Sequence, residues 1–279
     1  MQDHFKSATQ TALVEFVGIV IFAAAVALAA GLVPPTLSGA PLVVVGVLLA
    51  LVPAAIWLVA FYRQDRVEPE PKRYVVGVFV LGAVLAQAIG QPVIRDLFQV
   101  QRWAGDDPLL GFLGSVLIVG LVQEFLKYAA VRYTIFNAAE FDQPVDGIIY
   151  AASAGLGYAT MLNIQYVIGN GGVDLGVGAI RVSVEALAQA SSAGVLGYFL
   201  GQAKFRSMGP LWLPAGLLAA ALLNGAVNTL IDRAPLIGTF GFNAWYGLVA
   251  AAVIAGVTFG SLMAVMGRLN AAALKQGKA

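Results

Sequence analysis

Apolar residues fill long stretches of this chain, and the stretches lack the strict alternation of a half-buried strand. A helix that crosses a bilayer needs about 20 consecutive, mostly apolar residues. Eight stretches meet that length and predict an all-α, polytopic integral membrane protein with about eight transmembrane helices. The predicted spans cover residues 9–31, 41–62, 74–94, 109–136, 147–168, 177–203, 210–231 and 243–268.

Two polar segments interrupt the apolar stretches in the first half of the chain. Residues 63–73 read RQDRVEPEPKR, which is typical of a charged, proline-containing loop. Residues 95–108 are expected to hold a short interfacial helix, with Trp103 at the level of the lipid headgroups. The chain then divides into an N-terminal three-span region at 1–108, a four-helix core at 109–231, and a last span with its tail at 232–279.

Positive charge in the short loops predicts the orientation in the membrane. With eight spans, both termini and every second loop share one side, which holds eleven of the 16 Lys and Arg residues. The other side holds Arg95, Arg102 and Arg233. The prediction is a multi-pass protein of the cell (inner, cytoplasmic) membrane, with both termini in the cytoplasm.

Composition supports a membrane protein and excludes several kinds of site. Charged residues make up 11% of the chain, against about 25% in a soluble domain, and the net charge of +1 argues against nucleic-acid binding. The chain has no cysteine, so disulfides and thiolate sites are excluded. Its single histidine, His4, precedes the first span, so no histidine within the membrane can bind a metal, haem or chlorin.

Ionisable residues within a membrane are costly and are usually paired or face a polar interior. Within the predicted spans they are Glu15, Glu124, Lys127, Arg181 and Glu185. Glu124 and Lys127 are three residues apart, and Arg181 and Glu185 are four apart, so each pair is expected to share a helix face and form an ion pair. Glu15 stands alone in its span.

Further polar side chains recur at helical spacing in four successive spans. We expect these stripes to turn inward and to form a polar core between spans four and seven. Hydrogen bonds that hold the helices together remain an alternative for any single stripe. The expected core residues are Glu124, Lys127, Tyr166, Arg181 and Glu185, with Asn163, Gln189, Ser192, Asn224, Asn228 and Asp232 on the same faces.

Three motifs point to a known family. They are FDQPVDGIIY at 141–150, GLGYA at 155–159 and GYFLG at 197–201. Together with the helix QEFLKY at 123–128, they resemble the PrsW family of intramembrane metalloproteases, which are related to the CAAX-type membrane proteases. The resemblance covers about 110–231 and implies a multi-span helical fold built around a metal-dependent proteolytic site.

The resemblance also shows where this chain departs from the family pattern. Glu124, Lys127, Asn163, Arg181 and Asn228 are retained. Positions that hold a catalytic or metal-binding Glu in the family are Gln123 and Leu162 in this chain, and positions that hold His are Gln189 and Asn224.

These substitutions remove most of the metal-binding groups, because a hydrolytic zinc site needs about three nitrogen, sulfur or carboxylate ligands. We therefore expect no catalytic residues, no bound metal and no cofactor. The amides of Gln123, Gln189 and Asn224 are expected to bond to one another instead.

Asp142 and Asp146 flank Pro144 just before the fifth span. Asp146 is expected to cap the N-terminus of that helix, and both are expected to belong to the structural polar core. Gly155 and Gly157 are expected to allow close helix packing.

Three functions remain open at this stage. The first is a pseudoprotease that binds other integral membrane proteins, and lipids, as an accessory, scaffold or assembly subunit of a larger membrane complex. The second is an active intramembrane metalloprotease with an altered site. The third is a transporter or lipid-binding protein that uses the paired charges.

Overall fold

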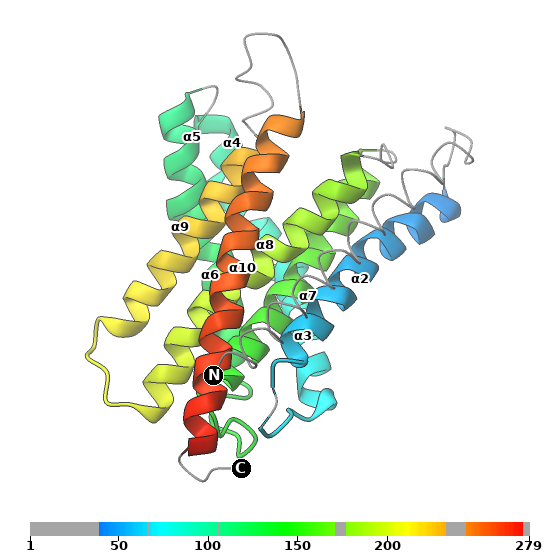
Figure 1. Cartoon of the computed structure of the whole chain (residues 1–279). Coiled ribbons are helices and arrows are strands. Elements are labelled where there is room, and N and C mark those ends of the chain that lie inside the picture. Colours follow the sequence, from blue (N-terminus) through cyan, green and yellow to red (C-terminus); the bar gives the residue numbers. More distant parts are fainter. Residues whose placement is uncertain (1–38, 66, 105–106, 171–176, 233–243, 276–279) are drawn as a thin grey trace.

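The computed structural model describes residues 39–275 except 66, 105–106, 171–176 and 233–243. Within these ranges every regular element is a helix, and the long helices lie side by side in one bundle (Figure 1). The all-α prediction is therefore confirmed. The first predicted span at 9–31, with Glu15, lies outside the described residues.

The helices have the following bounds. They are α2 (Ala40–Tyr62), α3 (Lys72–Leu85), η1 (Ala86–Gly90), η2 (Val93–Phe98), α4 (Val100–Ala104), α5 (Pro108–Gly114), η3 (Ser115–Gly120), α6 (Leu121–Arg132), α7 (Asp146–Gly169), α8 (Val177–Phe205), α9 (Trp212–Asp232) and α10 (Ala244–Lys275). The short helix α4 carries Trp103, as the sequence predicts, and about half of that side chain is exposed.

Five helical segments of the described chain are long and apolar enough to cross a membrane. They are Val43–Tyr62, Lys72–Ala104, Pro108–Arg132, Trp212–Asp232 and Trp245–Lys275. Helices α7 and α8 occupy the predicted 147–168 and 177–203 and have 24 and 29 residues, but they are not among the five. They carry the buried polar side chains and lie inside the bundle, so their composition is less apolar. The total of about eight spans stays a prediction.

Two of the membrane-crossing segments contain widened, π-helical turns. One segment widens at η1 and again at η2, on either side of Pro92, and the other widens at η3. Proline has no backbone N–H and disturbs the regular bonding of an α-helix around it. The break in regular bonding around Pro92 thus takes the form of widened turns. The structure contains η3 as well, which no residue pattern predicts.

Helix α7 lies at the centre of the bundle and packs most extensively against α8, α3 and α2. Glycines permit this close approach, as expected for Gly155 and Gly157. A side chain at Gly157 would collide with the backbone carbonyl of Phe79 in α3, and one at Gly155 would collide with the carbonyl of Gln189 in α8. In the opposite direction, a side chain at Gly82 of α3 would strike the carbonyl of Ala154. The backbones therefore meet directly.

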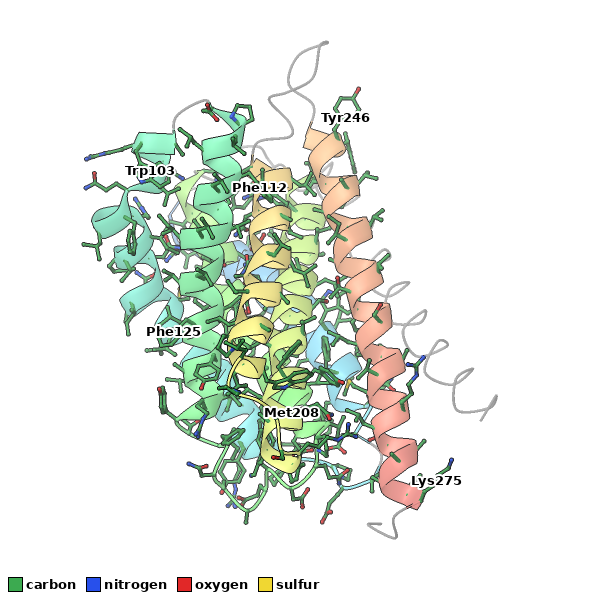
Figure 2. All side chains as sticks on the ribbon, turned by 90° about the vertical axis from the view of Figure 1, so that its left-hand side faces the viewer. Trp103, Phe112, Phe125, Met208, Tyr246 and Lys275 are labelled. Atoms are coloured by element: carbon green, nitrogen blue, oxygen red, sulfur yellow. The ribbon has the colours of Figure 1, made fainter. Side chains whose placement is uncertain are left out.

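The loops 63–71, 133–145 and 206–211 gather at one end of the bundle (Figure 1). Lys204, near the end of α8, donates hydrogen bonds to the carbonyls of Phe136 and Ala138, at 2.6 and 3.4 Å, and so binds the second of these loops. Figure 2 shows Met208 and Lys275 at this end, and Trp103 and Tyr246 at the other. The loops predicted to share one side of the membrane therefore do lie together.

The close contact between α3 and α7 yields a test of the fold. Gly82→Ala and Gly157→Ala are each expected to lower the midpoint temperature of unfolding in detergent, because overpacking of this kind costs about 1 to 3 kcal/mol. Gly77→Ala is the matched control on α3, since a side chain there meets no atom within 4 Å. The control is expected to be neutral or slightly stabilising, because alanine favours a helix over glycine. Equal midpoints for all three variants would contradict the packing described.

Candidate functional site

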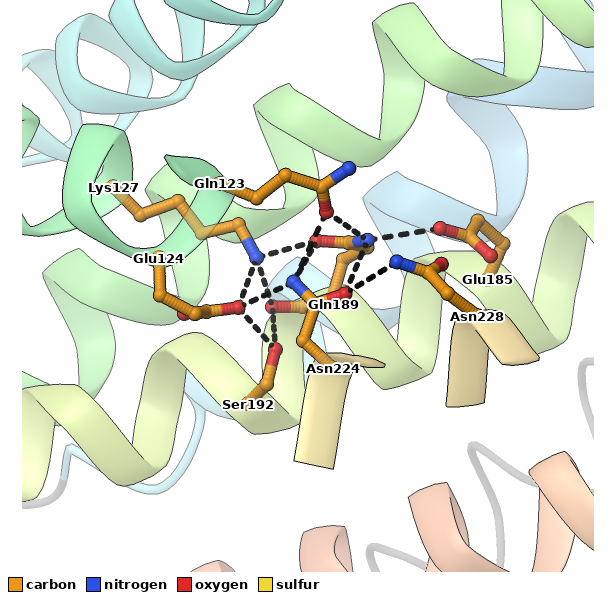
Figure 3. Close-up of polar contacts among 8 residues, drawn as sticks. All are labelled: Gln123, Glu124, Lys127, Glu185, Gln189, Ser192, Asn224 and Asn228. Carbon is orange, nitrogen blue, oxygen red and sulfur yellow. Dashed lines mark hydrogen bonds and ion pairs between the residues drawn. The ribbon is translucent and has the colours of Figure 1, made fainter. Parts of the chain in front are cut away.

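A network of buried polar side chains joins α6, α8 and α9 in the middle of the bundle (Figure 3). We call it the amide network. Its members are Gln123, Glu124 and Lys127 from α6, Glu185, Gln189 and Ser192 from α8, and Asn224 and Asn228 from α9. All of them are buried except Asn228, which is partly buried.

The helix sequences explain why these groups meet. In α6, Gln123, Glu124 and Lys127 fall on one face together with Leu126, Ala130 and Val131, and that face is buried, whereas Phe125 is exposed. In α8 and α9 the network residues recur at spacings of three or four, as one helix face requires. The inward polar core expected between these helices is thus present.

Lys127 and Glu124 form an ion pair at the heart of the network. The Lys127 ammonium Nζ lies 2.6 Å from Oε1 of Glu124, and neither side chain has any exposed surface. The ammonium also donates to Oε1 of Gln189, and Ser192 donates to the same Glu124 oxygen at 2.8 Å. The predicted pairing of Glu124 with Lys127 is confirmed. Extra hydrogen bonds of this kind are what a buried ion pair requires.

The three amides bond to one another, as the sequence predicts. Gln189 Nε2 donates to Gln123 Oε1 at 3.0 Å, and Asn224 Nδ2 donates to the same oxygen at 3.0 Å. Asn224 Nδ2 also lies 2.7 Å from Glu124 Oε1. Asn228 Nδ2 extends the chain of bonds by donating to Asn224 Oδ1 at 2.9 Å. Each amide supplies both donors and an acceptor, so a set of amides can satisfy its own members.

Glu185 enters the network through Gln189, whose Nε2 donates to its Oε1 at 2.9 Å. The expected ion pair between Glu185 and Arg181 is corrected by the structure. Arg181 Nη2 instead lies 3.1 Å from Asp232 Oδ1, on α9. Its guanidinium also stacks over the ring of Tyr166 on α7, 4.1 Å from the ring centre. This arrangement joins α7, α8 and α9 near their ends.

Asn163, which retains the family residue, and Leu162, which replaces a family Glu, make no hydrogen bonds to the network. Asn163 is buried and donates from Nδ2 to the carbonyl of Val182 at 3.0 Å, which ties α7 to α8. Leu162 packs against a small apolar cluster of Ala86, Leu126 and Tyr158. The ring of Tyr158 in turn lies below Lys127, with 5.5 Å between Nζ and the ring centre.

Asp142 and Asp146 lie at the loop end of α7. Oδ2 of Asp146 accepts hydrogen bonds from the backbone N–H groups of Asp142, at 2.8 Å, and Gln143, at 2.6 Å. It makes no cap for α7, whose preceding residue is Val145. The capping role expected for Asp146 is therefore wrong, because the carboxylate binds the loop before the helix.

Sequence reasoning missed two residues next to Asp146. Tyr150 donates from its hydroxyl to the carboxylate of Glu70, and both residues are buried. The charged, proline-rich surroundings of Glu70 predict only a loop in contact with solvent. The two residues are far apart in the sequence, so no local sequence pattern indicates their contact.

The donor set of the amide network is a poor match for a catalytic metal. Its groups are four amides, three of which replace stronger ligands, together with two carboxylates, a hydroxyl and the ammonium of Lys127. Within the part of the chain that the structure describes, no three His, Cys, Asp or Glu side chains group closely enough to bind a metal ion. An ammonium bonded to Glu124 also repels any second cation at that oxygen.

Comparisons with known proteins agree with the resemblance read from the motifs. Residues 70–258 match the family described as "PrsW family intramembrane metalloprotease". Protease PrsW of Bacillus subtilis (strain 168) is 32% identical over 184 residues, which cover 65% of this chain and 80% of the relative. Protease PrsW of Geobacillus kaustophilus (strain HTA426) is 31% identical over 180 residues, covering 64% and 76% of the two chains. No solved structure matches.

The buried ion pair provides a test of the network. Glu124→Gln leaves the Lys127 ammonium buried without its counter-ion, and loss of one partner of such a pair is expected to cost about 3 to 5 kcal/mol. Unfolding in detergent, followed by circular dichroism, measures the change.

The exposed pair Arg73–Glu140 supplies the control. Its atoms are 3.6 Å apart and the Arg73 side chain is 74% exposed, so Arg73→Gln is expected to cost less than about 1 kcal/mol. The double variant Glu124→Gln, Lys127→Gln is expected to regain part of the lost stability. A Glu124→Gln variant as stable as the control would show that the pair is not buried as described.

Proposed function

Because this chain belongs to the PrsW family of intramembrane metalloproteases, we propose that it is a member without hydrolytic chemistry, a pseudoprotease that binds other integral membrane proteins. One observation carries the proposal: at three positions where the family places metal-binding or catalytic residues, this chain has amides that bond to one another. The scaffold around them retains Glu124, Lys127 and Arg181.

The metal implied by the family name does not fit the residues present. A hydrolytic zinc ion needs about three good ligands and one open position for water. Gln123, Gln189 and Asn224 offer neutral amide oxygens, which are weak ligands, and Leu162 offers none. Glu124 is already bonded to Lys127, Ser192 and Asn224.

In place of a metal, the ammonium of Lys127 supplies the positive charge of the core. It binds Glu124 and both oxygen atoms of Gln189, the side-chain Oε1 and the backbone carbonyl at 3.5 Å. A cation on a flexible stem thus neutralises Glu124 without an open position for a nucleophilic water. This supports a structural role for the network.

A surface on α10 supports the binding of a partner helix. Gly256 and Gly260 are four residues apart, and a side chain added at either would meet no atom within 4 Å among the described residues. Val253 and Val257 lie beside them and are largely exposed. Small residues at this spacing in an apolar helix allow the backbone of a second helix to approach closely. This surface supports the proposed role of an accessory or assembly subunit.

The proposed location is the cytoplasmic membrane of a bacterium, with the loops 63–71, 133–145 and 206–211 facing the cytoplasm. These loops share one end of the bundle, and the surplus of Lys and Arg lies at that end.

An active metalloprotease with an altered site is the second candidate, and the relatives that are named as proteases favour it. Protease PrsW of Bacillus subtilis aligns with this chain over 80% of its own length. This candidate requires a bound metal ion and activity that depends on Glu124.

Elemental analysis of the purified protein separates the two candidates. The native chain and the single variant Gln123→Glu are both expected to contain far less than one zinc per chain, because one carboxylate cannot replace the missing ligands. The triple variant Gln123→Glu, Gln189→His, Asn224→His is expected to gain zinc. One zinc per native chain, or proteolysis by the Gln123→Glu variant, would refute the pseudoprotease.

Crosslinking in intact membranes, followed by purification in mild detergent, tests for the partner. The chain is expected to purify with another integral membrane protein in fixed stoichiometry. Replacing both Gly256 and Gly260 with Ile is expected to reduce the amount of that partner at least several-fold. Gly77→Ile is the control, because Gly77 also meets no atom within 4 Å but lies on α3. A clean monomer from every sample would refute this role.

A further inference from the structure

The loop 63–71 is fastened to the start of α7 by acidic side chains that have almost no contact with solvent. Asp65 is 5% exposed, Glu70 3%, and Asp146 and Tyr150 0%. We call these four residues the carboxyl cluster. The cluster lies at the loop end of the bundle and is separate from the hydrogen bonds of the amide network.

One oxygen atom of each carboxyl group of the cluster has a defined donor. The Tyr150 hydroxyl donates to Oε2 of Glu70. The backbone N–H of Glu70 donates to Oδ2 of Asp65 at 2.8 Å, and the Tyr62 hydroxyl donates to the backbone carbonyl of Glu70 at 2.9 Å. Together with the two loop N–H groups on Asp146, these bonds fix both carboxyl groups in place.

The remaining contact is between two acids. The side chains of Glu70 and Asp146 lie within hydrogen-bonding reach of each other, and Oδ1 of Asp146 has no other donor among the described residues. Two ionised carboxylates are both acceptors and have no hydrogen to place between them. At this distance like charges also repel, so one of the two groups keeps a proton.

The surroundings strengthen this preference for a proton. Asp65 and Asp142 add negative charge beside Glu70, Glu140 adds it beside Tyr150, and Glu68 adds it beside Asp65. The facing cation is Lys204 of α8, and its ammonium is bonded to carbonyls of the 133–145 loop rather than to a carboxylate. Within the described residues neither Glu70 nor Asp146 has an ion pair.

We propose that Glu70 and Asp146 share one proton, and that this proton latches the 63–71 loop to α7 so that its loss to solvent releases the loop. On release, the O–H bond of the acid breaks, the proton passes to water, and two carboxylates remain side by side. Their repulsion, and the favourable hydration that each gains on leaving the interior, separate the loop from the helix. The device is independent of the proposed loss of proteolysis.

The raised pKa values of Glu70 and Asp146 set the pH range in which the two acids share one proton. Burial, with a smaller contribution from neighbouring acids, raises the pKa of Glu70 from its ordinary 4.5 to about 7, although the bond from Tyr150 opposes the rise. Burial likewise raises the pKa of Asp65 to about 6. For acids with raised pKa values, the stabilisation is complete below the ordinary pKa and is lost as the pH rises through the raised value. Burial, and then the charge of Glu70, raise the pKa of Asp146 further, from its ordinary 3.8 to about 9, so the pair keeps one proton at neutral pH. The latch is therefore closed at neutral pH and below, and it opens in the alkaline range.

Two measurements on the full-length chain in liposomes test the latch. Infrared spectroscopy detects the carbonyl stretch of a protonated carboxylic acid, which is expected to disappear as the pH is raised from about 5 to about 11. Because the chain has no cysteine, Glu68→Cys provides a single site for a spin label in the exposed part of the loop. The mobility of that label is expected to rise over the same pH range.

The variants locate the proton. Glu70→Gln and Asp146→Asn each supply a permanent N–H donor for the opposite carboxylate, so each is expected to remove the part of the infrared band that titrates with the pair and to keep the loop docked at every pH. Glu140→Gln is the matched control, because Glu140 bonds Arg73 at the surface, and it is expected to keep both responses. Tyr150→Phe removes a donor that favours ionised Glu70 and is expected to move the midpoint to higher pH.

Several outcomes would overturn the latch. A native chain without the infrared band at low pH, or with the same band in Glu70→Gln and Asp146→Asn, would refute the shared proton. A label whose mobility does not change with pH would refute the release of the loop. The same would follow if the mobility changed with pH equally in the native chain and in Glu70→Gln. A shift of the Tyr150→Phe midpoint to lower pH would also count against it.

Discussion

The need to neutralise Glu124 and Lys127 within a membrane constrains the rest of this structure. A single buried charge in an apolar surrounding is expensive, and even a pair is tolerated only when hydrogen bonds satisfy its remaining atoms. Here α8 supplies Gln189 and Ser192 and α9 supplies Asn224. Three helices are thus held in one register by one ion pair, because a shift of any of them by a residue would remove a donor.

Close packing of α9 against the turn η3, which leads into α6, makes this register possible. Side chains at Gly120 and Gly225 would collide with the backbone of the facing segment, so the two backbones are in direct contact. Side chains of ordinary size would keep these helices apart, and polar groups on facing helices would then lie beyond hydrogen-bonding distance. The hydrogen bonds between the polar residues of the core therefore depend on the small residues that allow the helices to approach.

Much of this arrangement is predictable from the sequence, because its causes are local. Glu124 and Lys127 pair within one helical turn, and the amides at Gln123, Gln189 and Asn224 lie on faces that helical periodicity already directs inward. The partners of Arg181 and Asp146 are not predictable in this way. Glu185 lies four residues from Arg181, but the structure brings Asp232 from another helix, and the loop before α7 takes the carboxylate expected to cap it. Contacts between distant segments depend on packing, which periodicity does not encode.

The widened turn η3 has a consequence for the evolution of such a helix. A π-helical turn contains about one residue more than an α-helical turn of the same height, so it behaves as a single-residue insertion absorbed without breaking the helix. Each added residue rotates the remainder of the helix by roughly 100°. The faces before and after Ser115–Gly120 are therefore set independently of one another. A lineage can redirect Gln123, Glu124 and Lys127 towards or away from the interior by gaining or losing one residue, while the half of the helix that precedes the turn keeps its contacts.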